Sequence, residues 1–254
     1  MSRKPFLAGN WKMFKTGEQA AEFIGQFKSV AASLGDRDIA LAVPATALET
    51  AAKAAQGSPL IIGAQNLFWE KEGAFTGEIS APMIKGAGAT MVIIGHSERR
   101  QFFGDTDEKV AKKLAAALAD GLLPVVCVGE NLSERENGKT LDVLSTQLTG
   151  SLAGLSAEAA ASIVVAYEPV WAIGTGKSAS EGEAQEVHVF LRRRLKETFG
   201  AEAADRIRII YGGSVKPENA ALILAQSEID GLLVGGASLK VDSFTKIVQS
   251  PYAG

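Results

Sequence analysis

Short hydrophobic runs alternate along this chain with longer stretches in which apolar and polar residues recur at helical spacing. Eight mostly apolar runs are present, at residues 6–8, 39–43, 60–64, 91–94, 125–128, 163–167, 207–211 and 232–234. Runs of this length and kind are typical of strands buried on both faces of a parallel sheet. The stretches between them are rich in Ala, Leu, Glu and Lys and predict helices, for example at residues 18–34, 107–119 and 181–199.

Strands that alternate with helices predict βαβ units and a parallel sheet. Eight such units in 254 residues match a closed (β/α)8 barrel of eight parallel strands. A doubly wound sheet is the alternative, but it would carry a glycine fingerprint after its first strand. Here the first strand leads directly into Asn10, Trp11 and Lys12. Because no linker or low-complexity segment interrupts the series, we expect one catalytic domain over residues 1–254.

Composition, charge and cysteine content indicate which partners and which compartment to expect. The chain is 46% hydrophobic and 22% charged, with a net charge of −3 and a pI of about 5.6. Its one basic tract, residues 192–194, falls inside a predicted helix and is interpreted as a solvated face, so nucleic acid is not an expected partner. Cys127 is the only cysteine, which fits a small buried side chain in a reducing compartment. No apolar run approaches the ~20 residues that span a bilayer, and no signal peptide is evident, so we expect a cytoplasmic protein without membrane association.

Polar residues and glycines follow several of the predicted strands. Asn10 and Lys12 come after the first strand, His96 after the fourth and Glu168 after the sixth. Glycine pairs end the last two strands, at residues 212–213 and 235–236. Each feature alone has an ordinary structural explanation. Since the carboxyl ends of barrel strands carry the chemistry of barrel enzymes, their common position predicts an active site there. His188, in the middle of a predicted helix, is interpreted instead as a core histidine.

The segment around Glu168 has an unusual order of residue types. A buried strand leads to Glu168, and Pro169 holds that residue in an extended conformation. An apolar tip at residues 171–173 follows, and then Gly174 and Gly176, whose backbone can approach an anion. A plain loop with a solvated glutamate is the alternative. The apolar tip favours a lid hinged beside a catalytic base, because an open loop rarely exposes such residues.

Five segments together resemble the triosephosphate isomerase family along the whole chain: Gly-Asn-Trp-Lys-Met at 9–13, Gly-His-Ser-Glu-Arg-Arg at 95–100, Ala-Tyr-Glu-Pro-Val-Trp-Ala-Ile-Gly-Thr-Gly at 166–176, Tyr-Gly-Gly-Ser-Val at 211–215 and Gly-Gly-Ala-Ser-Leu at 235–239. The resemblance implies a TIM barrel that interconverts dihydroxyacetone phosphate and D-glyceraldehyde 3-phosphate through an enediolate, in glycolysis and gluconeogenesis. It implies no cofactor and no metal. Another phosphosugar-acting TIM-barrel enzyme, or a scaffold without activity, remains the alternative.

The resemblance also implies roles for particular residues. Glu168 is the implied base, neutral His96 the donor to the developing oxyanion, and Lys12 the fixed positive charge, with Asn10 as a nearby polar donor. Glu98 lies close to the lysine and histidine in the family, and whether its role is catalytic or structural stays open. The remaining implied substrate-binding residues are Gly174, Gly176, Ser214, Gly235 and Gly236 at the phosphate and Ile173 and Leu233 as an apolar clamp on the carboxylate.

Physical arguments add two expectations about ionisation. Desolvation beneath a closed lid should raise the pKa of Glu168 towards the operating pH. His96 precedes a short helix that begins near Ser97, and the dipole of that helix disfavours a charged imidazole. We also expect Arg99 to pair with a nearby acid, for which Asp105 is the candidate.

The segment at residues 65–79 is too long and too apolar for a bare surface loop. In the family this segment docks beside the active site of a neighbouring subunit, with Thr76 near its tip and Phe75 beside it. The resemblance therefore implies a homodimer.

Overall fold

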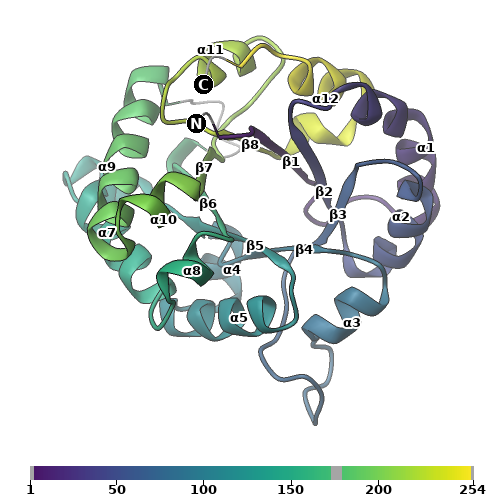
Figure 1. Ribbon diagram of the computed structural model, residues 1–254, viewed down its shortest axis with the longest axis horizontal. Helices are drawn as coiled ribbons and strands as arrows, with labels where there is room; N and C mark the ends of the chain where they lie inside the picture. Colours follow the sequence, from purple (N-terminus) through teal and green to yellow (C-terminus); the bar gives the residue numbers. More distant parts are fainter. Residues whose placement is uncertain (1–2, 173–178, 253–254) are drawn as a thin grey trace.

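A computed structural model describes residues 3–172 and 179–252 of the chain. Eight parallel strands form a closed barrel in sequence order, and helices surround it on the outside (Figure 1). The fold is therefore the predicted (β/α)8 TIM barrel and not a doubly wound sheet. The strands are β1 Phe6–Asn10, β2 Asp38–Ala42, β3 Ile61–Ala64, β4 Met91–Ile94, β5 Leu123–Val128, β6 Val164–Tyr167, β7 Arg208–Tyr211 and β8 Gly231–Val234.

The helices lie between successive strands. The α-helices are α1 Gly17–Ser33, α2 Leu48–Ala55, α3 Ala81–Gly86, α4 Ser97–Phe103, α5 Asp107–Ala119, α6 Leu132–Glu136, α7 Thr140–Ser151, α8 Ala157–Ala160, α9 Glu181–Phe199, α10 Ala201–Arg206, α11 Ala220–Leu224 and α12 Val241–Val248. The described residues also form short 3-10 helices, namely η1 Ala45–Ala47, η2 Val170–Ala172 and η3 Gly236–Leu239.

Local capping explains where the long helices begin. The helix predicted at 18–34 starts one residue earlier, because Thr16 and Gln19 form a capping box. The Thr16 hydroxyl accepts from the N–H of Gln19, and the Gln19 side chain accepts from the N–H of Thr16. Ser180 and Glu183 form the same kind of capping box at the start of α9. The predicted bounds of α5 and α9 are confirmed, and the predicted strands differ from the observed ones by at most two residues at an end.

Two apolar layers hold the barrel together. Alternate strand residues point inward and fill the interior, among them Phe6, Met91, Val125, Ile210 and Leu233. The residues between them point outward and pack against the surrounding helices. The interior is thus a packed core and not a pore, and substrate access is confined to the ends of the strands.

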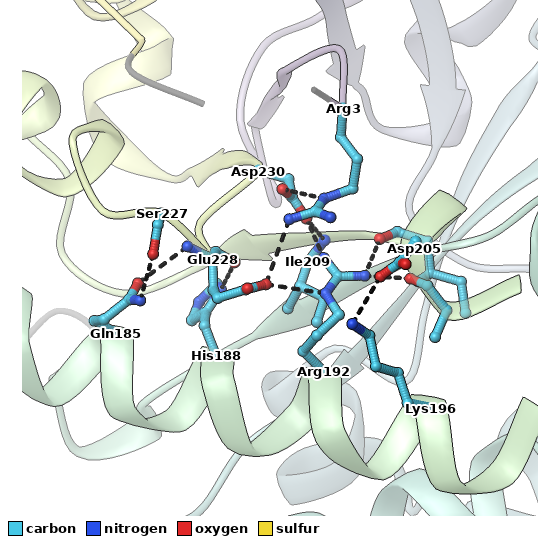
Figure 2. A network of polar contacts seen from close by, with 12 residues as sticks. Arg3, Gln185, His188, Arg192, Lys196, Asp205, Ile209, Ser227, Glu228 and Asp230 are labelled. Carbon is cyan, nitrogen blue, oxygen red and sulfur yellow. Dashed lines mark hydrogen bonds and ion pairs between the residues drawn. The ribbon is translucent and has the colours of Figure 1, made fainter. Parts of the chain in front are cut away.

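A network of buried ion pairs joins the amino ends of the last strands to α9 (Figure 2). The Asp230 carboxylate accepts from Arg3 at 2.6 Å, from Arg192 at 2.5 Å and from the Ile209 N–H at 2.7 Å. The expectation that residues 192–194 form a solvated face is wrong for Arg192, which is 3% exposed. Arg192 falls on the apolar stripe of α9, four residues after His188, which is buried as predicted.

Candidate active site

A cavity of about 480 Å³ opens at the carboxyl ends of the strands. Residues that follow β1, β4, β6, β7 and β8 line it together, as their positions in the sequence predicted. The residues proposed from sequence that line this cavity are Asn10, Lys12, His96, Glu168, Ser214, Leu233, Gly235 and Gly236. Ile173, Gly174 and Gly176, from the predicted lid, lie outside the described residues.

Glu168 is buried at the carboxyl end of β6, with only 2% of its surface exposed. Its carboxylate lies 2.9 Å from Nε2 of His96 and accepts from the Ser97 N–H at 2.9 Å and the Ser97 hydroxyl at 3.2 Å. Burial is the largest influence and raises the pKa of Glu168, but His96 and the Ser97 N–H together outweigh it. The pKa of Glu168 is therefore lowered. The predicted rise applies beneath a closed lid, whose residues 173–178 lie outside the described ones, and it stays a prediction.

His96 stands at the N-cap of α4. Its Nδ1 accepts from the Glu98 N–H at 3.2 Å, which assigns the ring hydrogen to Nε2, where it is donated to Glu168. Burial is the largest single influence and works against a charged ring, but the charge and hydrogen bond of Glu168 together with the charge of Glu98 outweigh it, so the pKa of His96 is raised. The predicted effect of the helix dipole is thus not the dominant one. The tautomer nevertheless presents an Nε2–H to the cavity.

Lys12 has a left-handed backbone, with φ of 52°, which is uncommon for a residue other than glycine. Three contacts hold this conformation and aim the side chain. The Lys12 N–H donates to the Asn10 side chain at 3.0 Å, the Lys12 carbonyl accepts from Gln65 at 2.9 Å, and the ammonium lies 2.6 Å from Glu98. A strained residue maintained by several partners is typical of a functional site.

The turns after β7 and β8 bring backbone close to these groups. A Cβ on Gly212 would lie 3.1 Å from Cγ of Glu168 and 3.7 Å from Cβ of Leu233, so the carboxylate and the leucine share one side of the cavity. A Cβ on Gly235 would lie 3.7 Å from Cε of Lys12. The 3-10 helix η3 begins at the next residue, Gly236. The lysine side chain therefore passes directly over the predicted phosphate-binding turn.

Sequence reasoning missed two residues that the structure places in contact with the site. Ser97 provides two of the hydrogen bonds to Glu168, and Gln65 supports the backbone of Lys12. A signal for Ser97 was present, because the first N–H groups of a helix are free to bind a carboxylate. No comparable signal marked Gln65, which follows β3 and reaches β1 only in the closed barrel.

The remaining predicted residues lie outside the cavity, and the predicted contact of Phe75 and Thr76 with a second subunit stays a prediction. Arg99 pairs with Asp105 at 3.3 Å, as predicted, and Lys113 pairs with the same carboxylate at 2.8 Å. Phe75 and Thr76 are exposed, on the loop that protrudes from the barrel before α3, and do not reach the cavity (Figure 1). Across residues 3–172 and 179–252, no three His, Cys, Asp or Glu side chains form a metal-binding group.

Comparisons with known proteins agree with this geometry. The sequence model of the family described as Triosephosphate isomerase matches residues 5–251. The triosephosphate isomerase of Carboxydothermus hydrogenoformans is 53% identical over 97% of this chain and 98% of its own length, and that of Solibacter usitatus is 52% identical over 97% and 99%. The crystal structure of triosephosphate isomerase from Bartonella henselae matches 96% of this chain and 98% of its own, with a TM-score of 0.86 at 44% identity. The chain therefore belongs to the triosephosphate isomerase family, the enzymes that interconvert dihydroxyacetone phosphate and D-glyceraldehyde 3-phosphate.

Proposed function

We propose that Glu168 is the base of this isomerisation and that His96 and Lys12 stabilise the charge that develops on the substrate oxygens. The reaction moves a proton between two adjacent carbons through an enediolate. The observation that carries the proposal is the 2.9 Å contact between the Glu168 carboxylate and Nε2 of His96, in a cavity that Lys12 also lines. A base, a neutral donor and a fixed cation are thus within reach of one small substrate.

The hydrogen bond between Glu168 and His96 suggests how the base is activated. A substrate carbonyl that accepts the Nε2–H takes this hydrogen bond away from Glu168. Burial then remains the largest influence on the carboxylate, so its pKa rises towards that of a useful base. Glu168 accepts a proton from the carbon next to the carbonyl and delivers it to the former carbonyl carbon. The hydroxyl hydrogen passes between the two substrate oxygens, which His96 faces.

Lys12 and the turns after β7 and β8 would hold the phosphate end. Ser214, Gly235 and Gly236 line the same cavity as Lys12. Their backbone N–H groups would bind the phosphate, and the lysine adds a positive charge. Glu98, at 2.6 Å from that ammonium, is 39% exposed at its side chain. We assign Glu98 to orienting Lys12, because its carboxylate lies 2.6 Å from the lysine ammonium and farther, at 3.6 Å, from Nδ1 of His96.

The test of the base is Glu168→Asp. Aspartate retreats by one methylene while keeping the charge, and misplacing a reacting group by ~1 Å can cost on the order of 100-fold in rate. We expect kcat to fall by about that factor, with KM for glyceraldehyde 3-phosphate changed far less. A kcat equal to that of the intact protein would remove Glu168 as the base.

We further propose a homodimer in which the loop at residues 65–79 enters a groove of a second copy. A second cavity of about 450 Å³ beside the active site has Met13, Glu98 and Phe103 among its lining residues. Met13 is 94% exposed and Phe103 65%, and Phe75 on the loop is 42% exposed. Apolar side chains this exposed around one groove favour a protein interface.

Thr76→Arg tests this interface, because a long charge at the tip of the loop would be buried without a partner. We expect sedimentation to show a shift towards monomer, together with lower activity. The control is Thr149→Arg, at an exposed position on α7. An intact and fully active Thr76→Arg dimer would contradict the assignment.

We also propose that residues 1–254 act as one catalytic domain in the cytoplasm. The single cysteine supports a reducing compartment, since its side chain is buried and its thiol unpaired. Within the described part of the chain, no helix has the length and apolar character needed to cross a membrane.

A further inference from the structure

The side chain of Gln147, on α7, forms two hydrogen bonds with the backbone of one residue, Gly129, which directly follows β5. Its Oε1 accepts from the Gly129 N–H at 2.8 Å, and its Nε2 donates to the Gly129 carbonyl at 3.0 Å. The amide side chain thus satisfies both polar groups of that residue, as a neighbouring strand would. Such paired bonds fix the position of the glycine with respect to the helix.

None of the described strands pairs with Gly129 on this side. The β4–β5 ladder ends at the pair Ile94 and Val126, three residues before Gly129. On the other side, the backbone N–H groups of Glu168 and Val170 donate to Val128 and Glu130, which skips Gly129. Gln147 therefore takes the place of the missing strand at the end of β5.

Gly129 is in turn packed against the backbone of Glu168. A Cβ at position 129 would lie 1.8 Å from the carbonyl oxygen of Glu168, 2.7 Å from its carbonyl carbon and 3.2 Å from its Cα. Gly129 does not have a positive φ, so the close approach is what requires glycine here. Any movement of Gly129 is therefore transmitted to the backbone that carries the carboxylate.

A cavity of about 460 Å³ lies behind this contact. Gln147, Gly129, Ser97 and Glu168 all line it. Without the amide of Gln147, water in this cavity would compete for the N–H and carbonyl of Gly129. Its backbone would then lose a fixed partner at the point where it supports Glu168.

We propose that Gln147 is a positioning residue for the isomerisation, which acts by holding Gly129 against the backbone of Glu168. The proposal rests on the proposed role of Glu168 as the base. Gln147 itself does not touch the cavity in which Lys12 and His96 lie. Its effect is on the placement of the carboxylate and hence on the proton-transfer step, rather than on substrate affinity.

The test is Gln147→Met, which keeps a similar volume and loses both hydrogen bonds. A shift of a few tenths of an ångström in the carboxylate predicts a fall in kcat of roughly 10-fold, with KM within about 2-fold of the intact protein. Gln147→Glu is the second variant, since it keeps an acceptor for the Gly129 N–H but loses the donor to the carbonyl. If either folded variant keeps the kcat of the intact protein, the positioning role is wrong.

The chain offers a matched control in Gln185 on α9. This partly buried glutamine also ties down a loop, accepting from the Glu228 N–H at 3.1 Å and donating to the Ser227 hydroxyl at 2.9 Å, at the amino end of the barrel (Figure 2). Gln185→Met should lower the unfolding midpoint about as much as Gln147→Met and leave kcat unchanged. Equal losses of kcat in the two variants would mean that both act only through stability.

A double-mutant cycle separates this proposal from the role of Glu168. In a Glu168→Gln background, Gln147→Met should lower the residual rate by less than about 2-fold, because there is no longer a base to position. A full 10-fold loss in that background would contradict the proposal. If Glu168→Gln alone kept the intact rate, the assigned base would fail, whatever Gln147→Met did.

Discussion

Each end of the barrel holds a buried carboxylate, and the two carboxylates have different hydrogen-bond partners. At the amino end, Asp230 is fully buried and accepts from two arginines and a backbone N–H. At the carboxyl end, Glu168 is also buried, but its partners are the ring of His96 and the N–H and hydroxyl of Ser97. Two arginines pair with the first carboxylate, whereas within the described residues no arginine or lysine pairs with the second.

The two buried carboxylates therefore have different roles, one in stability and one in catalysis. Asp230 is committed to protein groups that no substrate replaces, so its contacts stabilise the fold. The contact of Glu168 with Nε2 of His96 is one that a substrate carbonyl can take over, so the carboxylate remains available as a base. Substitutions at the two ends should therefore separate loss of stability from loss of turnover.

The largest effect is expected at the amino end, from Asp230→Ala. Removing one partner of a buried ion pair leaves Arg192, which is 3% exposed, with a poorly compensated charge. Such changes cost about 3–5 kcal/mol of unfolding free energy, whereas kcat of the folded protein should not change. Urea unfolding followed by fluorescence, with assays well below the unfolding midpoint, measures both. A large loss of kcat would contradict the expectation that the amino end affects stability and not turnover.

Lys12→Met should have the converse effect. Loss of one stabilising group typically costs ~10²–10³ in rate, while the partly exposed pair with Glu98 contributes at most ~1 kcal/mol to stability. The control is Lys15→Met, because Lys15 also has a positive φ of 73° and lies on the same loop. We expect steady-state kinetics to show the loss of rate for Lys12→Met and no such loss for Lys15→Met. A stable variant with full activity would remove Lys12 from the site.

The smallest of the three effects concerns His188, which hydrogen-bonds the Glu228 carbonyl near the amino-end network. Burial lowers the pKa of His188 from its ordinary 6.5 to about 3. Below pH 6.5 His188 is protonated in the unfolded chain but stays neutral in the folded protein. The free energy of unfolding therefore falls as the pH is lowered, until about pH 3. This histidine alone predicts a loss of about 2 kcal/mol between pH 6.5 and about pH 5.

His188→Asn removes this titration and keeps an amide donor for the Glu228 carbonyl. Urea unfolding of both proteins over this pH range should therefore show a shallower dependence for the variant. Identical slopes would mean that His188 does not contribute to the loss of stability in acid.

The sequence predicts the barrel and the position of its site because both follow from local patterns. Buried strands alternate with amphipathic helices, and parallel strands bring Lys12, His96 and Glu168 to one end. The lowered pKa of Glu168 was not predictable in this way. It depends on the distance to His96, which comes from a different βα unit and is set only when the barrel closes.

Three other residues that the sequence interpretation missed also depend on contacts with segments distant in the chain. Arg192 reads as one of three adjacent charges, and only the packing of α9 decides which of them is buried. Gln65 and Gln147 are ordinary polar residues by sequence. Gln65 acts on the backbone of the first βα unit, and Gln147 acts on a turn 18 residues before it in the chain. Contacts between distant segments therefore mark the limit of the prediction.

The most direct test of the account is hydrogen exchange at the substrate carbon in Glu168→Gln. In deuterated buffer, NMR follows the replacement of the reacting hydrogen of dihydroxyacetone phosphate by deuterium, alongside formation of glyceraldehyde 3-phosphate. Glutamine keeps the shape of the side chain and cannot accept the proton, so both exchange and isomerisation should fall together by at least ~10²-fold. Exchange that continued at close to the rate of the intact protein would contradict the assignment of Glu168 as the base.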